Sequence, residues 1–387
     1  MTGTRAEMLE RQRLKQEKQG EKKAEGTTRW DHLIPRINDD AVIPIISNAV
    51  RADPLFFGVL LDGEPVEPDV TPDEYLAELW ADRKPVYPFP DRQALARVAQ
   101  HKLVKGKDPE QAKRDYLSFL KEKLLDVAEE NPLVAGQVGE LRAEAAAGLP
   151  FSDIARMLGY PRFDSPETDD SLRLLARLNT LSIYVTTSPY DFMEQALEAE
   201  NRKNYRTQIC FWRGEPTGVR DEHRKDRDYR PTPQNPVVYH LFGHEQYPDS
   251  IVLAEDDYVD FLMRVSRTPV NQEDAILPGY LPAALRERSL LVMGYRLQDW
   301  DFRALFRGIV AAKPGEDRRL SLAIQFKPSP ARVMVRREED REAAVHEAEE
   351  YLQKYIKFIG PANFDIEWEN TDRFIRQLVA SWQEKQG

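Results

Sequence analysis

The stretch Arg288-Ser-Leu-Leu-Val-Met-Gly294-Tyr-Arg-Leu-Gln-Asp-Trp-Asp301 sets an apolar run directly before a glycine and a polar turn. Residues 288–293 predict a buried strand, because the run is short, continuous and apolar. Residues 300–311 predict a helix. A strand that leads through a glycine turn into a helix is the repeating unit of an α/β sheet.

The same alternation of strand and helix extends to both sides of this stretch. Further strands are predicted at 41–47, 181–185, 207–212, 237–241, 250–253, 320–325 and 364–368, and helices at 191–200, 255–265, 340–358 and 371–382. Strands that alternate with helices imply a mostly parallel, doubly wound sheet covered on both faces, so the expected fold class is α/β. Ligands of such sheets bind at the carboxyl ends of the strands, where the strand order switches.

Two parts of the chain depart from this alternation. Residues 1–27 are nearly all polar and cannot bury a core, so they predict a charged N-terminal arm. Residues 71–180 read as helices, two of which begin with proline and acids in the first turn. The predicted organisation is therefore an arm at 1–27 and one domain at 28–387. That domain includes a helical insertion at 71–180 and a final αβ part at 320–387.

Composition narrows the classes of protein to which the chain can belong. The net charge of −11 over 387 residues argues against a broad nucleic-acid-binding face, so nucleic acid is expected only through a partner. Cys210 is the single cysteine, so no intrachain disulfide can form and a reducing compartment fits. No signal peptide and no apolar run of membrane-spanning length are present. These features predict a cytoplasmic protein.

Gly294 has two interpretations from its spacing alone. A glycine after a buried strand lets a ligand approach the backbone, and a following helix start can hold a phosphate through free N–H groups. The competing interpretation is a plain connection in which Asp299 is the N-cap of the helix. The acids Asp299 and Asp301 at that helix start disfavour a phosphate.

The stretch at 290–303 resembles the late strand-and-turn motif of SIR2-like proteins from bacterial defence and conflict systems, which have a sirtuin fold. Other segments that are similar to the motifs of this family occur in matching order: Ile43-Pro-Ile-Ile-Ser-Asn48, Tyr184-Val-Thr-Thr-Ser-Pro-Tyr-Asp191, Pro236-Val-Val-Tyr-His-Leu-Phe-Gly-His244 and Asp249-Ser-Ile-Val-Leu-Ala-Glu-Asp-Asp-Tyr258. The resemblance implies that NAD is a substrate or ligand. The positions that it implies for NAD binding are Ser47, Asn48, Thr187, Asp191, Gly243, Gly294, Tyr295 and Arg296.

The chain departs from this family at the positions that matter most for catalysis. Members that hydrolyse NAD use an asparagine on the nicotinamide ribose and a histidine as base, and these positions read Ser188 and Phe242 here. His240 is a candidate replacement, because residues two apart in a strand share a face. The competing interpretation of His240 is a histidine that caps a strand end by hydrogen bonding. His244 lies beyond the strand and is expected to be exposed, so the candidate catalytic residues are Ser188 and His240.

Other site chemistries are not indicated by sequence spacing. No Cys/His or His/carboxylate spacing is typical of a metal site, so none is predicted. The chain also lacks Gly-x-Gly-x-x-Gly and Gly-x-x-x-x-Gly-Lys, which disfavours an ordinary dehydrogenase or a P-loop enzyme.

Two functions follow from the resemblance, and the sequence leaves open whether the chain is an enzyme. The first is an effector that hydrolyses NAD to ADP-ribose and nicotinamide in antiviral defence. The second is a catalytically degenerate scaffold or NAD-sensing subunit of a larger assembly. A homo-oligomer is expected in either case, together with a possible partner defence protein.

The arm at 1–27 is expected to mediate assembly, because its composition gives it no reason to be ordered in a lone monomer. Deleting residues 1–27 should change the oligomer mass in light scattering and leave thermal unfolding of the remaining chain nearly intact. An unchanged mass would refute this role.

Overall fold

The computed structural model describes most of the chain beyond residue 28. The described residues are 29–47, 50, 72–82, 94–106, 108–160, 170–226, 228–267, 275–295, 302, 306, 321–325, 340–359 and 364–386. Several sequence predictions lie outside them: the N-terminal arm, Asn48, Arg296, the N-cap at Asp299 and most of the helix at 300–311.

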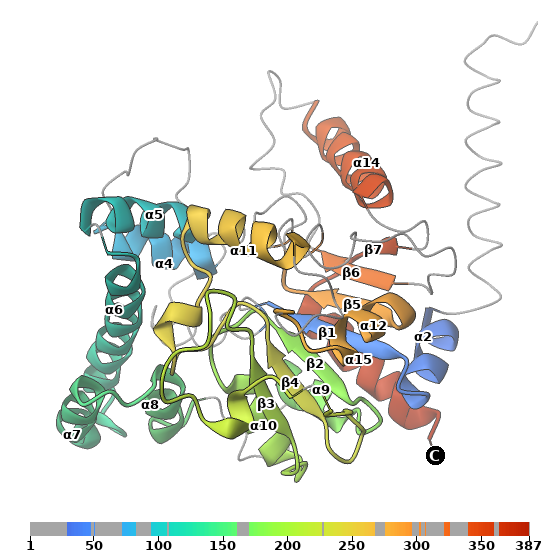
Figure 1. Cartoon of the computed structure of the whole chain (residues 1–387). Coiled ribbons are helices and arrows are strands. Elements are labelled where there is room, and N and C mark those ends of the chain that lie inside the picture. The colour runs from blue at the N-terminus through green and yellow to red at the C-terminus, as the bar shows by residue number, and fades with distance from the viewer. Residues whose placement is uncertain are drawn as a thin grey trace, which may run out of the picture.

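The centre of the fold is a seven-stranded sheet (Figure 1). Its strands are β1 (Val42–Ile46), β2 (Ile183–Thr186), β3 (Arg206–Ile209), β4 (Val237–His240), β5 (Ser289–Met293), β6 (Ser321–Gln325) and β7 (Phe364–Trp368). Their order is β3-β4-β2-β1-β5-β6-β7, and every pair is parallel. The predicted α/β class is confirmed.

The strand order changes direction at β1. The chain fills one side of β1 with β2, β3 and β4, and then crosses to the other side for β5, β6 and β7. Ile46 at the end of β1 is in register with Thr186 of β2 and with Met293 of β5. The carboxyl ends of these three strands therefore lie at one level, where a doubly wound sheet binds its ligands.

The sheet has a hydrophobic core on each face, and alternate strand residues enter opposite cores. Val42 and Ile46 belong to the first core, whereas Ile43 and Ile45 belong to the second. Helices that contribute to the first core include α2 (Arg29–Asn38), α9 (Ser171–Arg177), α10 (Phe192–Ala199) and α15 (Thr371–Glu384); those of the second are α11 (Glu255–Arg267), α12 (Tyr280–Glu287) and α14 (Arg341–Ile359). Burial on both faces explains why the central strands β1 and β5 read as continuous apolar runs, whereas the edge strands β3 and β7 contain charged residues.

A group of helices separates β1 from β2 in the sequence. They are α4 (Pro72–Trp80), α5 (Leu95–Gly106), α6 (Pro109–Glu130), α7 (Ala135–Ala146) and α8 (Phe151–Met157), followed by α9. Figure 1 shows α4 to α7 at one side of the sheet, with α5 beside α11. A buried ion pair holds α6 to α11, because Lys113 Nζ lies 3.3 Å from Asp257 Oδ2.

The predicted strand at 250–253 is wrong. This segment follows the short 3-10 helix η3 (Pro248–Ser250) and has no strand partner. The backbone N–H groups of Leu253 and Ala254 both donate to Asp257 Oδ2 at 3.0 Å. Because a side chain in the first turn of α11 accepts these two hydrogen bonds, the apolar segment packs as a loop and not as a strand.

Two further observations concern expectations for the chain as a whole. Cys210 is a buried free thiol, and burial raises its pKa to about 12, which keeps it protonated at neutral pH. Among the helices that the structure describes, none combines the length and apolar character needed to cross a membrane.

Candidate functional site

Four predicted NAD-binding residues meet where the strand order switches. The Ser47 N–H donates to the Met293 carbonyl at 3.0 Å, and the Ser47 hydroxyl donates to the Gly294 carbonyl at 2.5 Å. The hydroxyl oxygens of Thr187 and Tyr295 lie 2.7 Å apart. Side chains and backbone therefore link the turns after β1, β2 and β5 into one polar edge.

Packing within the chain accounts for the glycine at position 294. Its φ is +77°, and an added Cβ would lie 2.4 Å from Ser47 Oγ and 2.7 Å from Val50 Cγ2. The close approach is made by the turn after β1. A larger residue at Gly294 would strain the fold itself, so substitutions there do not isolate ligand binding.

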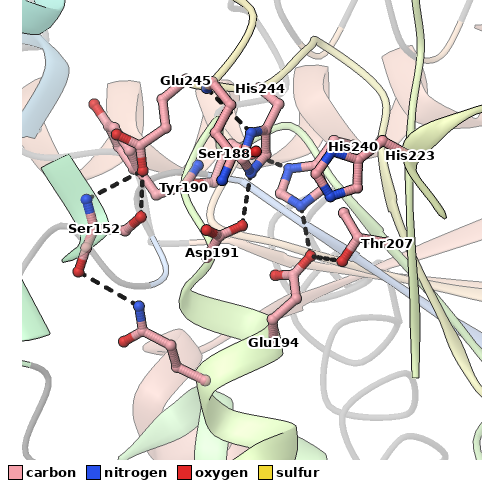
Figure 2. Close-up of polar contacts among 12 residues, drawn as sticks. Ser152, Ser188, Tyr190, Asp191, Glu194, Thr207, His223, His240, His244 and Glu245 are labelled. Atoms are coloured by element: carbon pink, nitrogen blue, oxygen red, sulfur yellow. Dashed lines mark hydrogen bonds and ion pairs between the residues drawn. The ribbon is translucent and has the colours of Figure 1, made fainter. Parts of the chain in front are cut away.

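A second group of polar side chains lies at the ends of β2 and β4 (Figure 2). We call Asp191, Glu194, His240 and His244 the polar cluster. His240 Nε2 lies 2.8 Å from Glu194 Oε1, and His244 Nε2 lies 2.6 Å from Asp191 Oδ1. The two imidazole rings meet edge-on with centroids 4.6 Å apart. The cluster therefore consists of two adjacent imidazole–carboxylate pairs.

The hydrogen bonds of His240 fix the direction of its protons. Nδ1 lies 3.0 Å from the Ser188 carbonyl oxygen, so Nδ1 must carry a proton and donate it. Nε2 then shares one proton with Glu194 Oε1, which also accepts from the Thr207 hydroxyl at 2.9 Å. The other carboxylate oxygen, Glu194 Oε2, is buried without a hydrogen-bond partner.

The second pair holds a negative charge on Asp191. Burial acts to raise the pKa of Asp191, but His244 lowers it by its charge and hydrogen bond, and with the weaker effects of His240 and His223 the pKa falls to about 2. Burial likewise opposes protonation of His244, yet Asp191 raises the pKa of this histidine overall. Asp191 is therefore ionised at neutral pH.

Ser188 and His240, the two predicted catalytic residues, are in contact, although the contact involves the backbone of Ser188. Its carbonyl accepts from His240 Nδ1, and its N–H donates to Thr186 Oγ1 at 3.0 Å. Ser188 is buried, with 6% of its surface exposed. The turn after β2 therefore orients the histidine.

Two expectations about the histidine segment are wrong. His244 is completely buried rather than exposed, because its loop folds back onto Asp191. His240 and Phe242 do not share a face. Phe242 packs on Tyr258 and Phe261 in the second core, whereas His240 faces α10 on the other side of the sheet. The alternation stops because β4 ends at His240.

An open cleft of about 830 Å³ adjoins the polar cluster. Acids outnumber bases among its lining residues: Asp153, Asp191, Glu194, Glu198, Asp221 and Glu222 stand against Arg156, Lys203, Arg206 and Arg220. His223 also lines the cleft, and burial together with the charge of His244 lowers its pKa to about 4, so it is neutral at pH 7. The cleft favours positively charged groups.

Glu194 and His244 were not among the site residues predicted from sequence. Asp191 and Glu194 are three positions apart at the start of a predicted helix, which places both on one helix face. That spacing was the available signal for Glu194. No local pattern pointed to His244, because its partner Asp191 lies 53 positions earlier in the chain.

The fold is that of an α/β protein with a doubly wound parallel sheet, and the comparison with known families matches part of the chain. Residues 182–355 match the SIR2-like domain, so the chain contains a domain of this family. The match begins at β2 and includes the polar cluster, Gly294 and Tyr295, whereas Ser47 on the turn after β1 precedes it. SIR2-like domains typically bind NAD. No curated protein matches the chain.

Gly243 is expected to be a strict packing requirement of this site. Its φ is +86°, and an added Cβ would lie 2.1 Å from the Ser250 carbonyl oxygen. Gly218 has a similar φ of +81° with nothing within 4 Å of an added Cβ, so it provides a matched control. In urea unfolding, Gly243→Ala should cost about 1–3 kcal/mol more than Gly218→Ala. Equal costs would show that the backbone angle, and not the contact with Ser250, requires glycine.

Proposed function

We propose that this protein binds NAD along the carboxyl edge of the sheet and hydrolyses the bond between nicotinamide and ribose. The observation that carries the proposal is the polar cluster, in which an ionised Asp191 and a partly unpartnered Glu194 line a cleft within a SIR2-like domain. Water adds to the ribose carbon, nicotinamide leaves with the electron pair of the broken bond, and a base accepts the proton of the water.

Asp191 is suited to stabilise the sugar during this reaction. Loss of nicotinamide develops positive charge on the ribose, and a fixed anion in a site of limited solvent access stabilises such charge. The hydrogen bond from His244 orients the Asp191 carboxylate and favours its ionised form. His244 therefore acts as a positioning residue for Asp191.

Glu194 is suited to accept the proton of the attacking water. Its Oε1 is occupied by His240 and Thr207, whereas Oε2 has no partner within the protein. Both nitrogens of His240 are hydrogen-bonded, whereas Glu194 Oε2 keeps unused acceptor capacity. We therefore assign His240 the role of orienting Glu194, instead of the role of general base that the sequence suggested.

The switch-point residues are proposed to hold the rest of NAD. Ser47, Thr187 and Tyr295 supply hydroxyl groups beside Gly294, at the edge where doubly wound sheets bind nucleotides. Thr187 is only half-buried, so it is accessible to a ligand. The turn after β2 connects this edge to the polar cluster, because Thr187 is followed by Ser188, whose carbonyl accepts from His240 Nδ1.

A second candidate function is an NAD-sensing or scaffold subunit without catalysis. Two observations favour it: Ser188 occupies the asparagine position of the NAD-hydrolysing relatives, and Phe242 is committed to packing in the second core. Such a protein would bind NAD and release no nicotinamide.

A role in antiviral defence, with a homo-oligomer or a partner defence protein, extends the proposal and rests on the resemblance of the sequence motifs. Phage plating on cells that express the wild-type protein or Glu194→Gln tests it. Protection that requires Glu194 would support the role, and equal plating on both strains and on cells without the gene would refute it.

Glu194→Gln should reduce nicotinamide release by at least about 100-fold, the usual cost of losing a general base. The matched control is Glu198→Gln, one helical turn later on α10, which lines the same cleft but is exposed and bonded to Tyr205. Asp191→Asn should lower turnover at least about tenfold because it removes the anion. Chromatography that quantifies released nicotinamide measures the turnover of all three variants.

Calorimetric titration of NAD separates binding from turnover. The three variants should retain NAD affinity within a few-fold, because the switch-point residues are unchanged. Hydrolysis that survives both Glu194→Gln and Asp191→Asn would overturn the assignment of roles. NAD binding without any hydrolysis by the wild-type assembly would favour the sensor.

A further inference from the structure

Asp191, His240 and His244 bring three potential metal-ligand atoms together from three separate segments. One atom from each side chain lies within 4.8 Å of the other two, and both histidines are fully buried (Figure 2). We propose that these residues bind a divalent transition-metal ion. The sequence predicted no metal site because no local spacing reveals a set assembled by the turn after β2, the end of β4 and the following loop.

The surroundings of His240 match those of a metal-binding histidine. Such histidines donate one ring N–H to a backbone carbonyl or carboxylate, which fixes the ring and leaves the other nitrogen for the metal. His240 Nδ1 donates to the Ser188 carbonyl, so Nε2 points into the polar cluster. A metal ion on Nε2 would displace the proton that this nitrogen shares with Glu194, and the bond from Nδ1 would hold the ring in place.

His244 also directs its Nε2 into the cluster. Its Nε2 contacts Asp191 Oδ1 at 2.6 Å, and its Nδ1 accepts the backbone N–H of Gln246 at 3.2 Å. A metal ion on Nε2 would displace the proton of that nitrogen to Nδ1, and the bond from Gln246 would be given up. Ligands of a tetrahedral zinc ion lie roughly 3.3 Å apart, so the contact with Asp191 would lengthen on binding and the wider separations, up to 4.8 Å, would shorten.

Glu194 supplies an independent indication of a missing positive partner. A buried carboxylate oxygen without a hydrogen-bond donor is costly, and Glu194 Oε2 is in this condition although only 4% of the residue is exposed. A cation in the cluster, or a water bound to it, would satisfy that oxygen. The excess of acids along the adjoining cleft favours entry of a cation.

The donor atoms indicate the kind of ion. Two imidazole nitrogens and a carboxylate oxygen suit Zn²⁺ and neighbouring transition metals, whereas Mg²⁺ and Ca²⁺ prefer all-oxygen sites. Zn²⁺ is therefore the expected ligand among common divalent ions, and Mg²⁺ is the informative negative control.

Metal binding is a property beyond the proposed NAD chemistry, and the two compete for Asp191, because a bound cation would neutralise the anion that is assigned to the sugar. Metal binding can be measured without NAD, so a failure to bind metal leaves the proposed hydrolysis untouched. The converse also holds, because an inactive protein can still bind zinc.

The experiment titrates ZnCl₂ into chelator-treated, full-length protein and counts bound zinc by elemental analysis. We expect one ion per chain, at least tenfold weaker binding in Asp191→Asn and His244→Ala, and at least 100-fold weaker binding of Mg²⁺ than of Zn²⁺. Zinc should also raise the melting temperature of the wild type and not that of Asp191→Asn. His346→Ala is the matched control, because His346 lies near Glu349 and Glu350 on α14 but is 72% exposed.

Asp191→Asn preserves the size of the side chain. If His244→Ala does not fold, zinc binding by Asp191→Asn therefore tests the site. No stoichiometric zinc in the wild type would overturn the proposal. Zinc binding that survives Asp191→Asn and disappears in His346→Ala would place the ion on α14 and would also overturn it.

Discussion

The register of β1 between β2 and β5 is the constraint on which the rest of the site depends. Ile46 is paired with both Thr186 and Met293, so the turns that follow the three strands emerge at the same level. Ser47 can then reach Gly294, and Thr187 can reach Tyr295. A shift of one residue in β1 would exchange its two apolar faces and separate these turns.

The parallel sheet also brings together a buried group of ionisable side chains, the polar cluster. Burying a charge is costly unless a partner compensates it, and each acid of the polar cluster has an imidazole partner. Removing one member leaves its partner buried and uncompensated. Substitutions that conserve shape, such as Asp191→Asn and Glu194→Gln, therefore separate chemistry from folding better than alanine does.

Local patterns predicted the central strands because β1 and β5 are buried on both faces and are almost entirely apolar. The segment at 250–253 is also apolar, but Asp257 accepts from the backbone N–H groups of Leu253 and of the next residue, Ala254, and the segment packs as a loop. Ser188 and His240 were found through the resemblance to a family. Glu194 and His244 were missed because their roles depend on contacts between segments far apart in the chain.

The sequence by itself determined the α/β class, the strands of the sheet and the positions of the turns after β1, β2, β4 and β5. These features depend on local apolar runs and glycines, which act over a few residues. Only the tertiary structure decided that His240 turns away from Phe242, that His244 is buried and that two carboxylates meet two imidazoles. The physical reason is that a side chain's neighbours, burial and protonation are fixed by segments more than 40 residues away, as in the Glu194–His240 and Asp191–His244 pairs.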